Sequence, residues 1–148
     1  VLSGLLLGPV AGGVCGGLGA FFYDLTNPLY ADEAILTFFM KFVIGFFAGL
    51  IAHSGGRRGE NHLFNGIGAA VGSAAYVALY LGKSFIKEYY LLRNPMETVL
   101  TKLAVKGASS ATNAVIAVVV ALILCPIFIT AMKRAGIYNR LFPKQPEQ

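Results

Sequence analysis

Polar side chains inside apolar segments are the residues of this chain that could do chemistry. Lys41 and Asn113 each lie within a long apolar segment, and Tyr76 and Tyr80 are four residues apart within a third. That spacing places both tyrosines on one face of a helix. Ionisable groups inside a membrane are costly and usually face the bundle interior or a wet cavity, and an asparagine there needs a hydrogen-bond partner. The tyrosines and the asparagine suit a flat heteroaromatic ligand, whereas a lysine suits a carboxylate or a phosphate.

Each of these residues also has a simpler explanation. Lys41 can extend its ammonium group to the nearer interface, and the tyrosines can belong to the aromatic belt of the membrane surface. Contacts between small-residue helices account for the hydroxyl groups near Asn113, and Lys102 and Lys106 suit the wet face of an interfacial helix. Five polar residues nevertheless share one half of the membrane, which predicts a polar pocket there. They are Asp24, Lys41, Tyr76, Tyr80 and Asn113.

The motifs of catalysis and of metal binding are absent from the sequence. It contains no HExxH, no GxSxG and no P-loop, so we predict no catalytic residue and no hydrolysis of ATP by this chain. His53 and His62 flank a polar loop, and Cys15 and Cys125 lie in separate apolar segments without metal-ligand or CxxC spacing. We therefore expect a protein that is not an enzyme and that holds neither a metal nor a cofactor.

The composition is that of an integral membrane protein. Of the 148 residues, 56% are hydrophobic and 13% are charged, whereas a soluble domain has about 25% charged residues. This length suits a single domain, residues 1–148, built as one compact bundle. The net charge of +5 is best explained by loop lysines and arginines that set the orientation of the chain in a membrane. We therefore expect a lipid bilayer, and not a nucleic acid, as a partner.

The alternation of apolar and polar stretches predicts an all-α bundle of about five to six transmembrane helices. The predicted spans are 9–24, 33–52, 63–81 and 109–132, set against the roughly 20 residues that a bilayer requires. Residues 1–7 are too short to span and read as the end of an earlier helix, so we expect a first helix upstream. A helical pattern from Pro95 to Met132 is divided at Gly107 into an interfacial helix, 95–106, and the last span. Pro126 should kink that span near its far end.

Small residues recur every four positions in the first part of the chain. On one helix they would form a smooth stripe that lets another helix approach closely. In water so many glycines inside a helix would cost up to about 1 kcal/mol each relative to alanine, whereas in lipid they favour packing. The residues are Gly4, Gly8, Gly12, Gly16 and Ala20.

The lysines and arginines of the loops set the predicted orientation. Four alternating spans place the loop that contains Arg57 and Arg58 on the same side as the basic tail that starts at Lys133. The positive-inside rule makes that side cytoplasmic. The acidic loop 25–33 and the charged connector 83–93 then lie outside, and the pocket opens outward with Asp24 as a possible partner of Lys41.

Residues 5–52 resemble part of a known family of importers. In the first part the similarity is carried by the segment 5–9 (LLLGP), Gly12, the segment 16–19 (GGLG) and Asp24. This part is similar to the second and third helices of S components. These are the substrate-binding subunits of energy-coupling factor (ECF) vitamin importers. The segment 37–41, TFFMK, with Gly45 and the segment 48–50, AGL, resembles their fourth helix. From residue 63 onward the similarity is one of topology alone.

The resemblance implies uptake without catalysis by this subunit. An S component of the bacterial cell membrane captures a water-soluble vitamin or related micronutrient in an outward-facing pocket. It then associates with a transmembrane scaffold subunit and two ATPase subunits, and it topples in the membrane to release its cargo. S components have six helices, so the first helix, which contacts the scaffold, would be missing here. Riboflavin, cobalamin and pantothenate carriers share this core, so the resemblance does not name the vitamin.

The same resemblance completes the predicted substrate-binding set. The outer loops 25–33 and 83–93 would help to cover the pocket, and Tyr30 lies in the first of them. Tyr30 therefore joins the five polar residues as a candidate contact to the substrate.

Other classes of membrane protein stay open as alternatives. A glycine-zipper channel would form a homo-oligomer with its polar residues at one depth on a single repeated helix, whereas here they are spread over several helices. A subunit of a larger membrane complex without a ligand of its own would fill its pocket with its own side chains. A membrane enzyme is the least favoured of these alternatives, because no catalytic motif is present.

Overall fold

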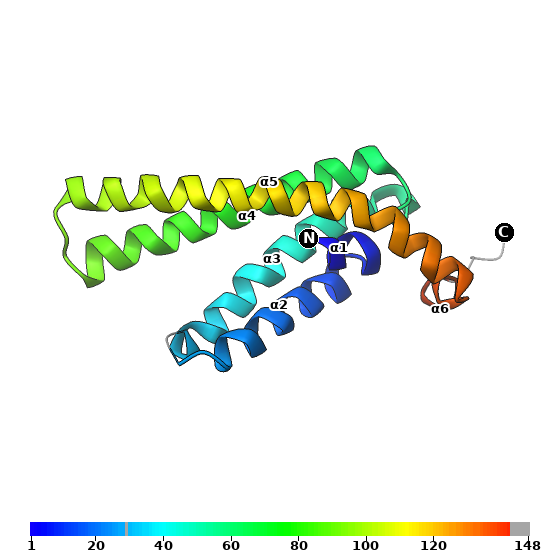
Figure 1. Cartoon of the computed structure of the whole chain (residues 1–148), viewed down its shortest axis with the longest axis horizontal. Helices are drawn as coiled ribbons and strands as arrows, with labels where there is room; N and C mark the ends of the chain where they lie inside the picture. Colours follow the sequence, from blue (N-terminus) through cyan, green and yellow to red (C-terminus); the bar gives the residue numbers. More distant parts are fainter. Residues whose placement is uncertain (29, 143–148) are drawn as a thin grey trace.

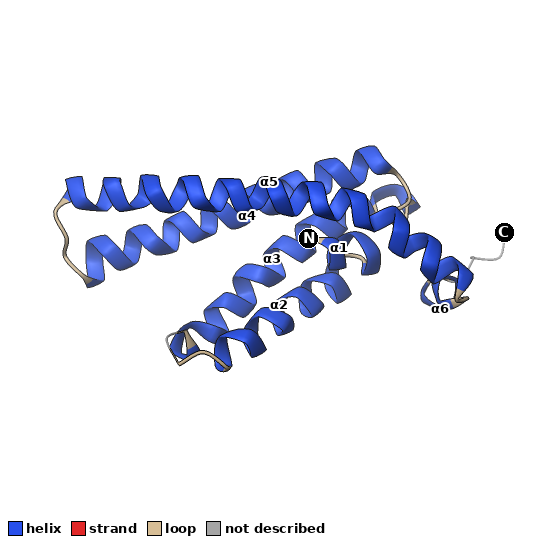
Figure 2. Cartoon of the chain, viewed as in Figure 1, coloured by secondary structure: helices blue, strands red, loops and turns tan. Residues whose placement is uncertain are grey.

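The part of the chain that the structure describes, residues 1–28 and 30–142, consists of helices and short connections (Figures 1 and 2). This computed structural model contains no β-strand within those residues, so the predicted all-α class is confirmed. The α-helices are α1 (Leu2–Leu7), α2 (Pro9–Leu25), α3 (Ala34–Ala52), α4 (His62–Ile86), α5 (Met96–Arg134) and α6 (Ile137–Leu141). Two 3₁₀ turns, η1 (Ala31–Glu33) and η2 (Ser54–Gly56), and a π-helix, η3 (Lys87–Leu91), connect them. Residues 143–148 of the predicted cytoplasmic tail lie outside the described residues.

The distribution of large and small side chains is the one expected in lipid. Among the residues that the structure describes, three segments are long and apolar enough to cross a membrane, Ala31–Ala52, His62–Leu91 and Met96–Arg134. Large apolar side chains such as Ile35 and Val115 lie on the outside, each more than 60% exposed, while alanines such as Ala48 and Ala69 fill the core. A soluble protein buries its large apolar residues, whereas helices in a bilayer use small residues for their contacts.

The long helices form two antiparallel pairs, α2 with α3 and α4 with α5, which diverge toward their connecting loops (Figure 1). Contacts between α3 and α4 join the pairs. A Cβ atom on Gly68 would lie 2.6 Å from the carbonyl oxygen of Ala48, and one on Gly72 would lie 2.7 Å from that of Ile44. The backbones of α3 and α4 therefore touch directly at this point, and no side chain larger than hydrogen fits between them.

The small residues near the start of the chain pack three helices together, but they do not form one stripe. Gly8 has a φ of +86° and separates α1 from α2, so that α1 folds back against α2. Gly4 and Gly12 consequently face each other from different helices, and a Cβ atom on Gly45 of α3 would lie 2.6 Å from the carbonyl oxygen of Gly12. The expected use of glycine for close packing is confirmed at these positions. The continuous stripe is wrong, because the positive φ of Gly8 interrupts the helix.

Helix α5 is continuous over 39 residues, from Met96 to Arg134. The expected division at Gly107 is absent, because a single glycine costs a helix only about 1 kcal/mol relative to alanine. Gly107 lies beside Leu81, whose side chain is 3.7 Å from the position that a Cβ atom would take. That residues 95–106 lie at the membrane interface stays a prediction. Pro126 lies inside α5, and Figure 1 shows the helix bending in its later part.

Candidate functional site

A cavity of about 340 Å³ lies between α3, α4 and α5. Four of the six predicted binding residues line it, namely Lys41 from α3, Tyr76 and Tyr80 from α4, and Asn113 from α5. The rest of the lining comes from α5 and consists of Val105, Lys106, Ser109 and Ser110. Residues from three helices thus meet in one place, although their role in binding a substrate stays a prediction.

Lys41 faces an aromatic ring. Its Nζ atom lies 4.2 Å from the centre of the Tyr76 ring, and the rings of Tyr76 and Tyr80 stack with their centres 5.9 Å apart. A cation over an aromatic face is stabilised by about 0.5–2 kcal/mol. Within the described residues Lys41 forms no ion pair. Its ammonium group can therefore donate hydrogen bonds to a ligand in the cavity.

Ser110 is a cavity residue that the sequence prediction missed. Its side chain is 7% exposed, and its Oγ atom has no hydrogen-bond partner in the described part of the chain. A buried hydroxyl group without a partner costs about 1–3 kcal/mol, which a polar ligand would offset. In the sequence this serine stands among small residues that simply indicate helix packing. Its distance of three residues from Asn113 is the signal that could have identified it, because that spacing places both on one face.

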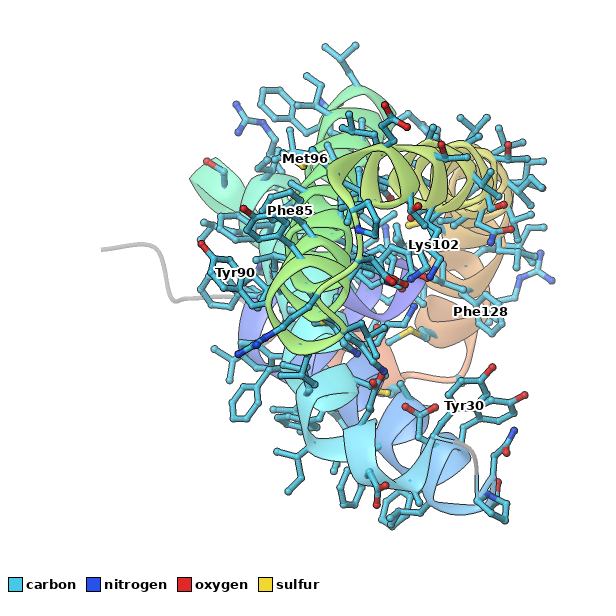
Figure 3. All side chains as sticks on the ribbon, turned by 90° about the vertical axis from the view of Figure 1, so that its left-hand side faces the viewer. Tyr30, Phe85, Tyr90, Met96, Lys102 and Phe128 are labelled. Carbon is cyan, nitrogen blue, oxygen red and sulfur yellow. The ribbon has the colours of Figure 1, made fainter. Side chains whose placement is uncertain are left out.

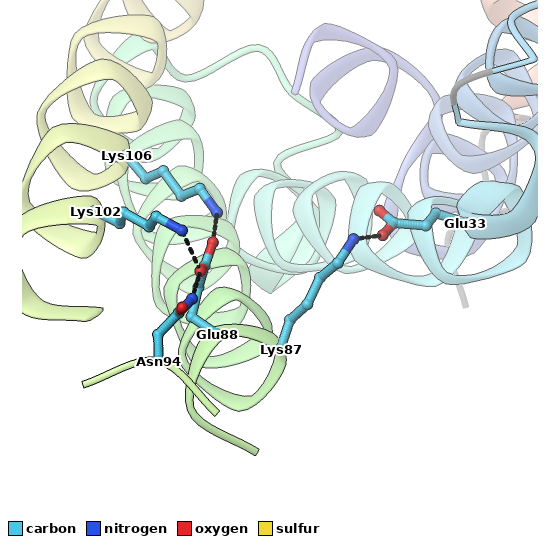
Figure 4. A network of polar contacts seen from close by, with 6 residues as sticks. All are labelled: Glu33, Lys87, Glu88, Asn94, Lys102 and Lys106. Atoms are coloured by element: carbon cyan, nitrogen blue, oxygen red, sulfur yellow. Dashed lines mark hydrogen bonds and ion pairs between the residues drawn. The ribbon is translucent and has the colours of Figure 1, made fainter. Parts of the chain in front are cut away.

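A buried carboxylate lies beside the cavity (Figure 4). Glu88, in η3, is 6% exposed, and its Oε1 atom accepts a hydrogen bond from Nζ of Lys106 at 3.2 Å. Its Oε2 atom accepts from Nζ of Lys102 at 2.7 Å and from Nδ2 of Asn94 at 2.8 Å. The two lysines therefore contact η3 across the hairpin, which their spacing along α5 did not predict. Because Lys106 also lines the cavity, Glu88 positions one of the cations there.

A second carboxylate joins the start of α3 to the end of α4. Glu33 accepts hydrogen bonds from Nζ of Lys83 at 2.5 Å and from Nζ of Lys87 at 2.7 Å. Figure 4 shows the pair of Glu33 with Lys87 on the other side of the ribbon from Lys102 and Lys106. Along the antiparallel α3 and α4, the contact of Lys41 with Tyr76 lies between these ion pairs and the glycine contact. The ion pairs thus lie at the end of this helix pair that is remote from the glycine contact, beyond the cavity.

Asp24 and Tyr30 are the two predicted residues that do not line the cavity. Asp24 is buried near the end of α2, and within the described residues no ion pair joins it to Lys41, its possible partner. Tyr30 lies in the connection between α2 and α3 and is half exposed. Figure 3 shows it at the edge of the molecule, apart from Tyr90 of the other hairpin. The prediction grouped Asp24 and Tyr30 with the other four residues because all six were expected in the same half of the membrane or in the loop above it. In the structure the pair of α2 and α3 diverges from the pair of α4 and α5, and this separates Asp24 and Tyr30 from the cavity.

One protein family matches most of the chain. The model of the family described as "ECF-type riboflavin transporter, S component" matches residues 1–134. No curated protein and no solved structure matches the chain. The predicted resemblance to S components is thereby confirmed, and with it a membrane transport subunit with several transmembrane helices. The chain belongs to the family of ECF-type riboflavin transporter S components.

Proposed function

We propose that this chain captures riboflavin outside the cell, in the cavity between α3, α4 and α5. The observation that carries the proposal is the buried Oγ atom of Ser110, which lacks a partner in the described residues and lies in a cavity with Lys41, Tyr76 and Asn113. An apo cavity lined in this way has unused hydrogen-bonding groups that a ligand can satisfy. Its volume of about 340 Å³ is near the lower end of the roughly 300–1,000 Å³ of small-molecule sites.

The lining suits a flat ring system with polar edges. The faces of Tyr76 and Tyr80 offer a surface on which an aromatic ring can stack. The ring carbonyl oxygens of a flavin are acceptors, and Lys41 and Asn113 can donate to them. Ser110 can then donate to, or accept from, the remaining polar edge. The matching family is described as a riboflavin transporter, and the lining of the cavity suits a ligand of that chemical class.

Delivery of the ligand follows from the role of S components. We infer that the loaded chain associates with an ECF scaffold subunit and two ATPase subunits, which supply the free energy of ATP hydrolysis. The loop that contains Arg57 and Arg58 and the C-terminal tail would face the cytoplasm, because they carry the basic residues expected there. A single cysteine placed at Ser54, in a background without Cys15 and Cys125, would then react with a membrane-permeant maleimide and not with an impermeant one in intact cells.

The first experiment is native mass spectrometry of the protein purified from bacteria, followed by titration with riboflavin. A monomer that carries one riboflavin is the expected result, with quenching of flavin fluorescence on binding. Replacing Lys41, Tyr80 or Asn113 by alanine should each weaken affinity about tenfold, which corresponds to the loss of about 1.4 kcal/mol. Tyr90→Ala is the matched control, because Tyr90 is exposed on the same hairpin and does not line the cavity.

Unchanged affinity in all three cavity variants would overturn this assignment of the site. An adduct with the mass of another vitamin would keep the transport function and replace the substrate. A ligand-free homo-oligomer would instead favour a glycine-zipper channel. That alternative has less support, since the polar groups of the cavity come from three different helices of one chain.

A further inference from the structure

A second cavity, of about 530 Å³, lies at the other end of the molecule from the candidate substrate site. The loop between α3 and α4, the end of α5 and the short helix α6 enclose it. Its charged lining consists of three cations, Arg57, Arg58 and Lys133, and one carboxylate, Glu60. The cavity is therefore electropositive, and nothing in the proposed binding of riboflavin uses it.

Aromatic rings and backbone groups hold two of these cations in place. The guanidinium carbon of Arg57 lies 3.7 Å from the centre of the Phe64 ring, and its Nη1 atom donates to the carbonyl oxygen of Ser54 at 2.7 Å. Nζ of Lys133 lies 5.1 Å from the centre of the Tyr138 ring and pairs with Glu60 at 2.5 Å. Stacking uses the flat face of a guanidinium group and leaves N–H groups on its edge for a ligand. Cations fixed in this way lose little conformational entropy when an anion binds.

The backbone of the same loop has a conformation that suits an anion. Arg58 has a φ of +51°, which is uncommon for a residue other than glycine, and it follows Arg57, which is right-handed with a φ of −69°. Alternation of right-handed and left-handed residues turns the N–H groups of Arg57 and Arg58 toward one side, as in an anion-binding concavity, whereas the next N–H, that of Gly59, donates to the carbonyl oxygen of Ala52 at 3.3 Å. Helix α6 holds the loop in this shape, because Tyr138 Oη donates to the carbonyl oxygen of Arg58 at 3.2 Å. Nη1 of Arg58 in turn donates to the carbonyl oxygen of Phe142 at 3.2 Å.

We propose that this cavity binds a phosphate group. Planar guanidinium groups bind phosphate through paired hydrogen bonds, and a lysine adds a point charge. Two sources share this chemistry, the headgroup of an anionic phospholipid and free inorganic phosphate. If the loop faces the cytoplasm, the anionic lipids of the inner leaflet lie next to the cavity, which favours the lipid as the source.

The test measures binding of phosphatidylglycerol and of inorganic phosphate to the full chain purified in detergent. Native mass spectrometry counts retained phosphatidylglycerol, with phosphatidylcholine as the zwitterionic comparison, and ³¹P line broadening follows inorganic phosphate. The test variant is Arg57→Gln with Lys133→Gln, and the matched control is Arg134→Gln with Arg140→Gln. Both double variants remove two positive charges from the same end of the molecule, but Arg134 and Arg140 are exposed and do not line the cavity.

The expected result is one retained phosphatidylglycerol per chain, with affinity lowered about tenfold or more in the test variant and less than about twofold in the control. Binding of inorganic phosphate with the same dependence on Arg57 and Lys133, without retention of lipid, would support the site and assign the free anion as its source. Equal losses in both double variants, or no loss in either, would overturn the proposal. If the test double variant does not fold, Arg57→Gln alone against Arg140→Gln alone gives the same comparison.

Discussion

The two ends of the contact between α3 and α4 are built in opposite ways. At one end Gly68 and Gly72 bring the two backbones into direct contact, and no space remains. At the other end Lys41 and Tyr76 line an open cavity, and Glu33 joins the helices through long lysine side chains. Lipid gives helices little hydrophobic reason to close on one another, so the size of the side chains between them decides where they touch. The closed end fixes the geometry of the pair, and the open end leaves the candidate cavity between the helices.

The closed end should be the more sensitive to added volume, and Gly68→Ala tests this. Its Cβ atom would lie 2.6 Å from a backbone oxygen, so α3 and α4 must separate, and we expect the free energy of unfolding to fall by about 3 kcal/mol. Thermal unfolding in detergent measures the change. Gly82→Ala in the same helix is the control, because nothing lies within 4 Å of its Cβ position, and it should be neutral or stabilising by up to about 1 kcal/mol. Equal effects of both substitutions would show that the backbones are not in contact at Gly68.

The open end depends on buried charge, and Glu88→Gln should be the next most damaging change. It leaves Lys102 and Lys106 facing a neutral amide. Breaking a buried ion pair is costly, but the partial exposure of these lysines reduces the cost, so we expect the free energy of unfolding to fall by about 2 kcal/mol. Thermal unfolding again gives the value, and riboflavin titration should show weaker binding because Lys106 loses its fixed position. Glu97→Gln, an exposed glutamate at the start of α5, serves as the control. A loss no larger than that of Glu97→Gln would mean that Glu88 does not organise this end.

Removal of the ion pairs of Glu33 should have a smaller effect. Glu33→Gln leaves Lys83 and Lys87 unpaired, but these side chains are part exposed, so we expect a change below about 1 kcal/mol in the free energy of unfolding. The difference between Glu33→Gln and the original protein should shrink in high salt, because exposed charges are screened. Thermal unfolding at low and high sodium chloride tests this. Glu60→Gln breaks the exposed pair with Lys133 at the other end of the molecule, and it should cause a similarly small, salt-dependent change in the free energy of unfolding. If salt leaves the effect of Glu33→Gln unchanged, the prediction is contradicted.

The smallest effect on stability should come from the protonation of His53, which lies at the closed end, as the pH falls. Burial lowers the pKa of His53 below its usual 6.5, although its Nε2 atom donates to the carbonyl oxygen of Leu5 at 3.0 Å. The unfolded chain then binds more protons than the folded one, so the stability that neutral His53 contributes is full above pH 6.5 and is lost as the pH falls below that value. Unfolding temperatures measured on both sides of pH 6.5 should show the decline. His53→Gln should remove it and His62→Gln should not, while a decline that persists in His53→Gln would assign it to another group.

The parts of the site that could be predicted are those whose signal is local. Lys41 and Asn113 stand out because polar groups are costly in an apolar segment, and the spacing of Tyr76 and Tyr80 places them on one face. The pairing of Glu88 with Lys106 depends on how α4 and α5 are placed in space, and no spacing within either helix contains that information. Ser110 was missed for the opposite reason, since a serine in a small-residue helix has an ordinary explanation.

The same distinction holds for the fold. The helices themselves follow from apolar length, and the close packing of glycines follows from their size. The place where a helix is interrupted does not follow as directly, because one glycine can either end a helix or leave it intact. Gly8 takes a positive φ and separates α1 from α2, whereas Gly107 stays inside α5. Pro9 follows Gly8 and suits the first position of a new helix, so the sequence predicts that break. No proline stands beside Gly107, and there the packing of α5 against α4 decides the outcome.

Glu88 should also determine which net charges the candidate cavity accepts. Lys106 lines the cavity with its charge already compensated by a carboxylate, so an electrically neutral molecule can enter without displacing a counterion. An acidic molecule would have to compete with Glu88 for Lys106, and only Lys41 offers it a cation without a carboxylate partner among the described residues. The cavity should therefore discriminate by valence as well as by shape, accepting uncharged compounds most readily and disfavouring dianions. Competition of riboflavin with its phosphate ester at increasing pH would expose this preference, which should grow as the ester gains its second charge.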